Sequence, residues 1–181
     1  MIINSLKYPN FTSNFINRTQ IIKTGNGIPI DASFIEIDSS NYNDVKAMEA
    51  VDKLWGGNTF ATNIYQAARA KRNKSVYYAQ SHIYALTLQD KDFDKIEPGQ
   101  ILGVAHINKK ANNAGYLENI QSKPDCVYSI NPEYKYIGSG ILNSLKKLYN
   151  EISLTSSNRK FYVKNGFKEI TKNHYVWKNN N

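Results

Sequence analysis

The sequence has 181 residues, of which 41% are hydrophobic and 21% are charged, so it suits one globular domain that buries its own core. Its apolar runs are too short to cross a membrane, and its first residues lack the basic and apolar regions of a secretory signal. The single cysteine, Cys126, excludes a disulfide framework and a cysteine-based zinc site. We therefore expect a cytoplasmic protein with no membrane partner.

The positive charge of the chain favours an anionic partner. Lysine and arginine together number 23, aspartate and glutamate 15, and the net charge is +8. A charge of this sign raises the local concentration of anions, and both nucleic acid and a polyphosphate cofactor are compatible with it. The basic residues are scattered along the chain, with their densest run at residues 70–74.

The first half of the chain predicts strands around a pair of helices. Residues 1–33 are polar and contain TGNGIP, which is typical of a hairpin turn or loop, and we interpret them as an N-terminal elaboration. Residues 34–38 alternate like a half-buried strand. Helical spacing follows in Val45, Met48, Val51 and Trp55, and then in Ile64, Ala67 and Ala68, with Gly56 and Gly57 between the two helices. Strand formers come next, at residues 75–89, 101–108 and 114–122.

The second half alternates helices with short strands. Apolar residues recur at helical spacing from Ile141 to Tyr149 and predict an amphipathic helix. A short strand is expected at residues 151–156, then a two-turn helix at 158–165 that Gly166 would close in a left-handed conformation. Strands at 167–171 and 174–178 complete a mixed α/β layer with helices on both faces.

The segment KYIGSG, at residues 135–140, has the parts of an anion site. The first N–H groups of a helix have no intrahelical partner and lie at the positive end of its dipole. Gly138 and Gly140 would let a phosphate approach the backbone without a Cβ in the way, and Lys135 adds a positive charge. The spacing fits neither a Rossmann fingerprint nor a P-loop. By itself the pattern is equally compatible with an ordinary helix N-terminus.

A second segment gives this loop a more specific meaning. YKYIGSGIL followed by SLTSSNRKFYVKNGFKEI resembles the two signature regions of the GNAT superfamily of N-acetyltransferases. The first region is a Gly-x-Gly loop that opens a helix. The second is a short helix bearing Phe-Tyr, followed by Gly-Phe at the start of a strand. The resemblance covers residues 101–172, the acyl-CoA-binding core, and implies a single acetyltransferase domain over residues 1–181 with a mostly antiparallel sheet.

The resemblance also implies a cofactor and roles for particular residues. The cofactor would be acetyl-CoA, and the acceptor an amine-bearing small molecule or protein. Tyr162 would protonate the leaving thiolate. The pantetheine arm would pair with the strand residues Ile120, Gln121 and Ser122. The pyrophosphate would lie on the loop amides of Lys135, Tyr136, Ile137, Gly138, Ser139 and Gly140. No metal is required, and the three histidines, His82, His106 and His174, are isolated in the sequence.

Glu118 is the residue we interpret as the catalytic base. A base is useful because an ammonium group must lose a proton before it attacks. Partial burial beside Tyr116 and Ile120 would raise the pKa of a carboxyl group toward a useful range. The competing interpretation is a carboxylate paired with a lysine on a solvated face. His106, by contrast, is typical of a histidine satisfied within a sheet.

Two features of the sequence depart from the GNAT pattern. Lys135 stands where the family usually has arginine or glutamine, which is a mild change because the loop binds through backbone N–H groups. The strand before the loop has two possible ends, Ser122 or Asn131, and we prefer the first. A non-catalytic module that senses acyl-CoA or docks nucleic acid remains the alternative to an enzyme.

Overall fold

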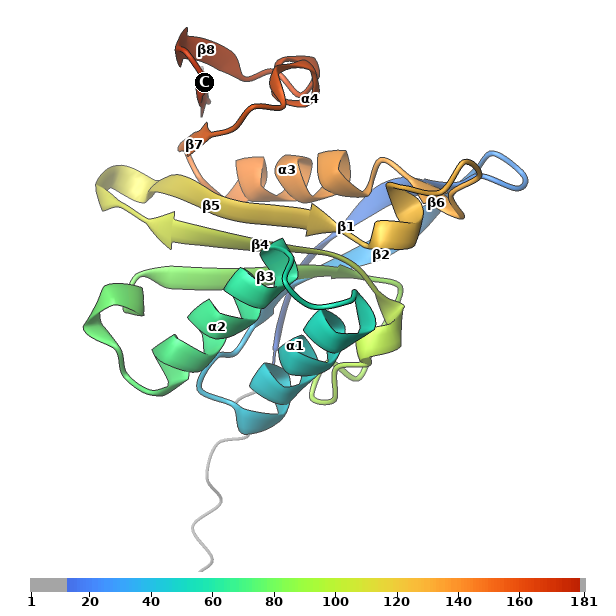
Figure 1. Cartoon of the computed structure of the whole chain (residues 1–181), viewed down its shortest axis with the longest axis horizontal. Helices are drawn as coiled ribbons and strands as arrows, with labels where there is room; N and C mark the ends of the chain where they lie inside the picture. Colours follow the sequence, from blue (N-terminus) through green and yellow to red (C-terminus); the bar gives the residue numbers. More distant parts are fainter. Residues whose placement is uncertain (1–12, 180–181) are drawn as a thin grey trace, which may run out of the picture.

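A nine-stranded sheet runs through the molecule, with helices on both of its faces (Figure 1). The computed structural model describes residues 13–179, and the part of the expected N-terminal elaboration before residue 13 lies outside them. The strands follow one another across the sheet in the order β6-β1-β2-β3-β4-β5-β7-β9-β8. Their bounds are β1 (Asn14–Lys23), β2 (Ile28–Ile37), β3 (Ser81–Thr87), β4 (Ile101–Lys109), β5 (Ala114–Ser122), β6 (Tyr134–Lys135), β7 (Glu151–Thr155), β8 (Lys168–Thr171) and β9 (His174–Lys178).

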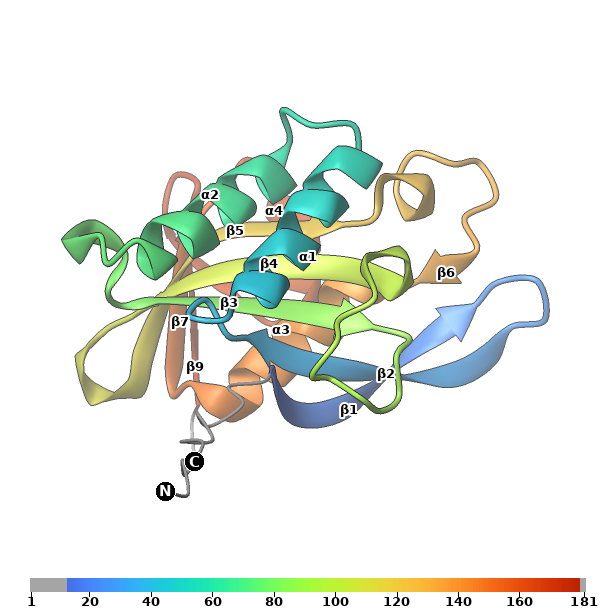
Figure 2. The same ribbon diagram turned by 90° about the horizontal axis from the view of Figure 1, so that it is seen from below.

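Two hydrophobic cores lie on opposite faces of this sheet, each under its own helices. The helices are α1 (Tyr42–Leu54), α2 (Phe60–Arg72), α3 (Ile137–Leu148) and α4 (Arg159–Lys164). On one face α1 and α2 cover a core that includes Ile35, Ile83 and Val104. On the other face α3 covers a core that includes Leu86 and Ile107 (Figures 1 and 2). The expected α/β class, with a mixed and mostly antiparallel sheet, is confirmed.

The apolar stripe of α3 shows why the sequence pattern predicted this helix correctly. Ile137, Ile141, Leu142 and Leu145 recur every three or four residues and are at most 3% exposed. Side chains at this spacing share one face of a helix, so burial of that face holds α3 against the sheet. Each fully buried aliphatic side chain contributes about 1.5–3 kcal/mol relative to an exposed one.

The N-terminal hairpin forms part of the nine-stranded sheet. β1 and β2 pair antiparallel along nearly their whole length, and a turn with Gly27 at φ +66° joins them. Ile21 on β1 and Ala32 on β2 are fully buried in the core beneath α3. The strand expected at 34–38 is therefore the end of a longer strand whose first half is more exposed.

The segment at residues 75–89 divides into two elements where one strand was expected. Val76–Tyr78 forms a 3-10 turn, and β3 begins only at Ser81. Val76 and Tyr77 are 80% and 89% exposed, so their strand propensity is not supported by any packing surface. Among the described residues, no helix combines the length and the apolar character that a membrane crossing needs.

The chain takes an indirect route from β5 to α3. After Ser122 the segment 123–133 contains only a short 3-10 turn, η4 (Pro124–Cys126), before the two-residue strand β6. β6 pairs with β1 at the far edge of the sheet, and α3 starts immediately after it. The open question about the preceding strand therefore has a definite answer. The strand that ends at Ser122 lies beside β7, and residues 123–133 are an insertion that leads into the glycine loop.

Candidate active site

The N-terminus of α3 presents free backbone N–H groups. The first helical bond joins Gly140 N to Tyr136 O over 2.8 Å, and no side chain caps the helix. The N–H groups of Ile137, Gly138 and Ser139 thus have no acceptor within residues 13–179. Tyr136 stands at φ +67°, a left-handed conformation that is rare outside glycine and turns the chain sharply into the helix. A helix mouth of this kind attracts an anion.

The two glycines of the loop lie against different neighbours. A Cβ on Gly140 would lie 3.2 Å from Thr19 Cγ2, so this glycine lets α3 approach β1 closely. A Cβ on Gly138 would lie 3.0 Å from Phe161 Cζ, in the second motif. The expectation that both glycines clear a path for a phosphate is therefore wrong for Gly140, which is buried against the sheet. For Gly138 the missing Cβ makes room for an aromatic ring.

The two sequence motifs meet in one cavity of about 490 Å³, which we call the junction cavity. Its wall includes the loop from Lys135 to Ser139 on one side and residues of α4 on the other. Ile120 and Ser122, at the end of β5, form a third side. Eight of the nine expected cofactor residues take part in this cavity or in the adjoining groove, and the buried Gly140 supports the loop from behind.

Tyr162 lies on the wall of the junction cavity with its ring held on three sides. The ring stacks on Tyr175 at 5.6 Å and meets the edges of Phe161 and Phe167 at 5.0 and 5.6 Å. Burial raises the pKa of Tyr162 to about 12, although a hydrogen bond with Ser156 works in the opposite direction. The hydroxyl group is therefore protonated at neutral pH, in a fixed position and able to donate.

The opening beside Tyr162 arises because β5 and β7 separate. The two parallel strands pair only through Ala114–Glu151, Gly115–Ile152 and Tyr116–Ser153. In the described part of the chain, no residue of β5 beyond Tyr116 pairs with β7. The main-chain groups on that edge of β5 are left for another partner, because a strand edge presents unpaired N–H and C=O groups.

Glu118 occupies a β-bulge next to this opening. His106 and Ile107 of β4 face Asn119 and Leu117 of β5, which leaves Glu118 as an extra residue. The expectation of a partly buried carboxylate is wrong, because Glu118 is exposed. The competing lysine pair is also absent among the described residues. Glu118 Oε1 accepts a hydrogen bond from Asn108 Nδ2 at 2.8 Å.

The bulge also changes which side chains share a face. Regular alternation would place Asn119 with Leu117, whose side chain belongs to the core beneath α3. Asn119 instead lines the same groove as Glu118, on the side of α2. Periodicity of the sequence could not reveal this, because a bulge inserts one residue into an otherwise regular pattern.

His106 is a buried sheet histidine with satisfied hydrogen bonds, as its sequence context predicted. Its Nε2 lies 2.9 Å from Ser81 Oγ and 3.2 Å from Asn108 Oδ1. Burial lowers the pKa of His106, and nearby Lys71 acts in the same direction. Asn108 thus connects a neutral imidazole to the Glu118 carboxylate.

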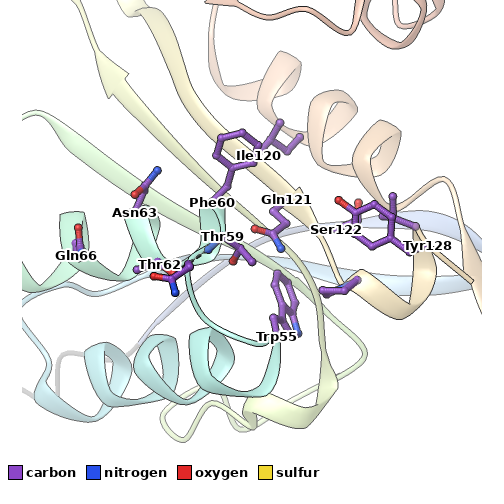
Figure 3. A pocket seen from close by; sticks show the side chains of 13 residues that line it. Trp55, Thr59, Phe60, Thr62, Asn63, Gln66, Ile120, Gln121, Ser122 and Tyr128 are labelled. Carbon is purple, nitrogen blue, oxygen red and sulfur yellow. Dashed lines mark hydrogen bonds between the residues drawn. The ribbon is translucent and has the colours of Figure 1, made fainter.

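A long groove extends from the junction cavity along α2, and we call it the α2 groove. It consists of two cavities, of about 790 and 600 Å³, which share Asn63 and Gln66. Figure 3 shows its larger part, with Ile120, Gln121 and Ser122 of β5 facing residues of α2 and the segment before it. Phe60 and Ile120 border both this groove and the junction cavity, so the two spaces adjoin each other.

Sequence reasoning missed two contributors to these spaces. The start of α2 lines both of them through Phe60, and the insertion lines both through Val127. A signal for the first was present, because Thr59 and Thr62 form a reciprocal cap at the start of α2. Trp55, at the C-terminal end of α1, is buried and also lines the groove. Burial raises the pKa of the Cys126 thiol, which agrees with a structural role.

Comparison with known proteins bears on the fold. No protein-family model matches the sequence, and no curated protein matches it. One similar solved structure is described as an acetyltransferase from Exiguobacterium sp. 255-15. The alignment covers 82% of this chain and 94% of that chain, with a TM-score of 0.51 and 16% sequence identity. The GNAT domain of S. lividans PAT covers 90% of this chain and 97% of its own, with a TM-score of 0.51 and 6% identity. The chain has the GNAT fold.

The two sequence motifs occupy neighbouring positions in this fold. The TM-scores of 0.51 support a common architecture, whereas identities of 16% and 6% leave the individual site residues as proposals. Within this GNAT fold the separated strands are β5 and β7, the glycine loop opens α3, and Tyr162 lies on α4.

Proposed function

We propose that the protein transfers an acetyl group from acetyl-CoA to an amine by direct attack in a ternary complex. The observation that carries the proposal is the junction cavity. There an uncapped helix mouth, an unpaired strand edge and a protonated tyrosine hydroxyl surround one space. These are the parts needed for a diphosphate, an extended amide-containing arm and a leaving thiolate. The α2 groove supplies access for the acceptor.

The residues of the junction cavity fit a coenzyme A molecule. The free N–H groups of Ile137, Gly138 and Ser139 would bind the diphosphate, at the positive end of a twelve-residue helix. Lys135 and Lys164 add two positive charges to the lining of the cavity. The unpaired edge of β5 at residues 120–122 would hold the pantetheine amides. Acetyl-CoA itself supplies an activated acyl carbon and a good leaving group.

Glu118 would prepare the acceptor for attack. An alkylammonium group such as that of lysine, with a pKa of ~10.4, needs about 4–5 kcal/mol to lose its proton at neutral pH. Glu118 would accept that proton, directly or through one water molecule. The Asn108 amide donates a hydrogen bond to its carboxylate at 2.8 Å and so orients it.

Acetyl transfer to the amine forms one bond and breaks another. The amine nitrogen bonds to the acyl carbon, and the carbon–sulfur bond breaks in the same sequence. A strand N–H of β5 can stabilise the oxyanion. The ammonium nitrogen loses two protons. One passes through Glu118 to solvent, and the other replaces the proton that Tyr162 gives to sulfur. The products are an N-acetyl amide and free coenzyme A.

Tyr162 would donate to the sulfur atom of the leaving thiolate. Its pKa of about 12 exceeds that of a free thiol, ~8.5, so complete transfer from an isolated tyrosine would cost about 5 kcal/mol. Tyr162 therefore donates a hydrogen bond to sulfur as charge develops, and its proton moves only as the amine proton replaces it.

Two measurements test the proposal together. Calorimetry should show acetyl-CoA binding at tens of micromolar or better, and a thiol-release assay across amine classes should show turnover. Absence of binding overturns the proposal. Binding without thiol release from any amine favours the non-catalytic sensing module. A steeply salt-dependent affinity for RNA or DNA, with no acetyl-CoA binding, favours nucleic-acid docking.

A further inference from the structure

The α2 groove has an unusual charge for this protein. The chain carries a net charge of +8, yet no lysine or arginine lines either part of the groove. Among the described residues of its wall, Glu118 is the one formally charged side chain, because burial lowers the pKa of His106. The groove therefore suits a molecule that is neutral along most of its length and carries one cation.

Side-chain amides dominate the polar part of the wall. Asn58, Asn63, Gln66 and Asn119 make no side-chain hydrogen bond to residues 13–179. Asn63 and Gln66 are three residues apart and project from the same side of α2 (Figure 3). Each free amide offers two donors and two acceptor sites. Such a wall complements a solute whose own groups both donate and accept, as hydroxyl groups do.

Exposed aromatic rings border the same groove. Phe60, Tyr77 and Tyr128 are 57%, 89% and 85% exposed. Covering the face of an exposed aromatic ring lowers the free energy, and a flat apolar surface of a ligand can cover it. A pyranose ring has such a face on its C–H side and hydroxyl groups around its rim.

We propose that the acceptor is an amino sugar, a compact polyhydroxylated ring with one ammonium group. This inference rests on the proposed acetyl transfer and names its acceptor class. The ammonium group lies at Glu118, whose Oε1 accepts from Asn108, so Oε2 remains for the ligand. The hydroxyl groups lie against the amides of α2 and β5, and the ring lies against an aromatic side chain.

Other amine classes fit the groove less well. A polyamine carries several charges, and one carboxylate in a strongly positive protein would leave most of them unpaired. A peptide usually gains affinity by adding a strand to a free sheet edge. Here one edge of β5 is paired with β4, and the other faces the junction cavity.

The first test compares three acceptors at equal concentration with acetyl-CoA. D-glucosamine, spermidine and triglycine represent the amino sugar, the polyamine and the peptide. We expect kcat/KM for thiol release to be at least about tenfold higher for glucosamine. A faster reaction with spermidine or triglycine overturns the acceptor assignment and leaves the acetyl transfer supported.

Direct binding separates this inference from the proposed function. Saturation-transfer NMR should detect glucosamine on the protein without acetyl-CoA. If acetyl-CoA fails to bind in calorimetry while glucosamine binds, the acetyl transfer is wrong and the groove assignment stands. If glucosamine shows neither saturation transfer nor turnover, the assignment is wrong.

A double variant locates the sugar in the groove. Asn63→Ala with Gln66→Ala removes two free amides, and we expect KM for glucosamine to rise about tenfold or more. The dissociation constant for acetyl-CoA should stay unchanged. Asn43→Ala removes an exposed amide from α1, away from the groove, and is the matched control. An unchanged KM in the double variant contradicts the assignment.

Discussion

Phe161 packs against Gly138, so the two GNAT-like motifs are in direct contact. A Cβ atom added to Gly138 would lie 3.0 Å from Cζ of Phe161. The contact joins the mouth of α3 to α4, and the rest of α3 and strand β7 lie between them in the sequence. Ser122, at the end of β5, lies near the same point, 3.6 Å from that Cβ position. Gly138 therefore controls how closely the glycine loop approaches the wall that bears Tyr162.

Gly138→Ala should weaken cofactor binding more than it changes stability. Alanine favours a helix over glycine by about 1 kcal/mol, which offsets part of the cost of displacing Phe161. The displaced ring would narrow the junction cavity, so we expect a several-fold rise in the dissociation constant for acetyl-CoA in calorimetry. Gly99→Ala is the control, because no atom lies within 4 Å of its Cβ position. Equal affinities in the two variants would argue against this role for Gly138.

Tyr162→Phe should slow turnover while the cofactor still binds. The change removes one hydroxyl group and keeps the ring packed on Tyr175. We expect kcat to fall about a hundredfold, the lower end of the usual range for a lost proton-transfer group. Tyr149→Phe removes another buried hydroxyl, which bonds to Tyr84 away from the site, and should leave kcat unchanged. Equal kcat in wild type and Tyr162→Phe removes Tyr162 from the mechanism.

The raised pKa of Tyr162 also predicts a change in alkaline stability. The folded-state pKa is about 12 and the reference value is 10.0, so the folded protein holds this proton more tightly. Its contribution, about 2–3 kcal/mol, is present below pH ~10 and is lost as the pH rises toward 12. Urea unfolding at pH 9 and at pH 11 should show a smaller loss in Tyr162→Phe than in wild type. Identical losses would contradict the assigned burial.

Glu118→Gln should remove the base and preserve the site. Glutamine has the same shape and can still meet Asn108, so acetyl-CoA affinity should not change. We expect kcat/KM to fall about a hundredfold at neutral pH. Raising the pH should restore part of the activity, because more of the acceptor is then already deprotonated. Activity that is unchanged at pH 7 assigns the proton transfer to another group or to solvent.

His106 predicts a loss of stability on mild acidification. Burial lowers its folded-state pKa below the reference value of 6.5, so the unfolded chain binds a proton more readily. Stability from this group is present above pH ~6.5 and is lost as the pH falls through the folded-state pKa. His106→Gln can still donate to Ser81, and its unfolding free energy should fall less between pH 7.5 and pH 5. A decrease as large as that of wild type would count against the buried neutral imidazole.

The parts of the fold that sequence reasoning predicted well are those with a local signal. β5 was expected at 114–122 and has these bounds, and α3 follows the apolar spacing after the glycine loop. Gly166 closes α4 at φ +79°, as a left-handed cap should. Each of these depends on residues within a few positions of one another, so the pattern is visible in the chain itself.

The sequence by itself thus determined the helices and strands that carry a local pattern and the two motifs that indicate a GNAT fold. Only the tertiary structure decided how the site is built. The separation of β5 from β7, the bulge at Glu118 and the packing of Gly138 against Phe161 are contacts between distant segments. Strand pairing and close packing depend on which surfaces meet, and a local pattern of residue types does not contain that information.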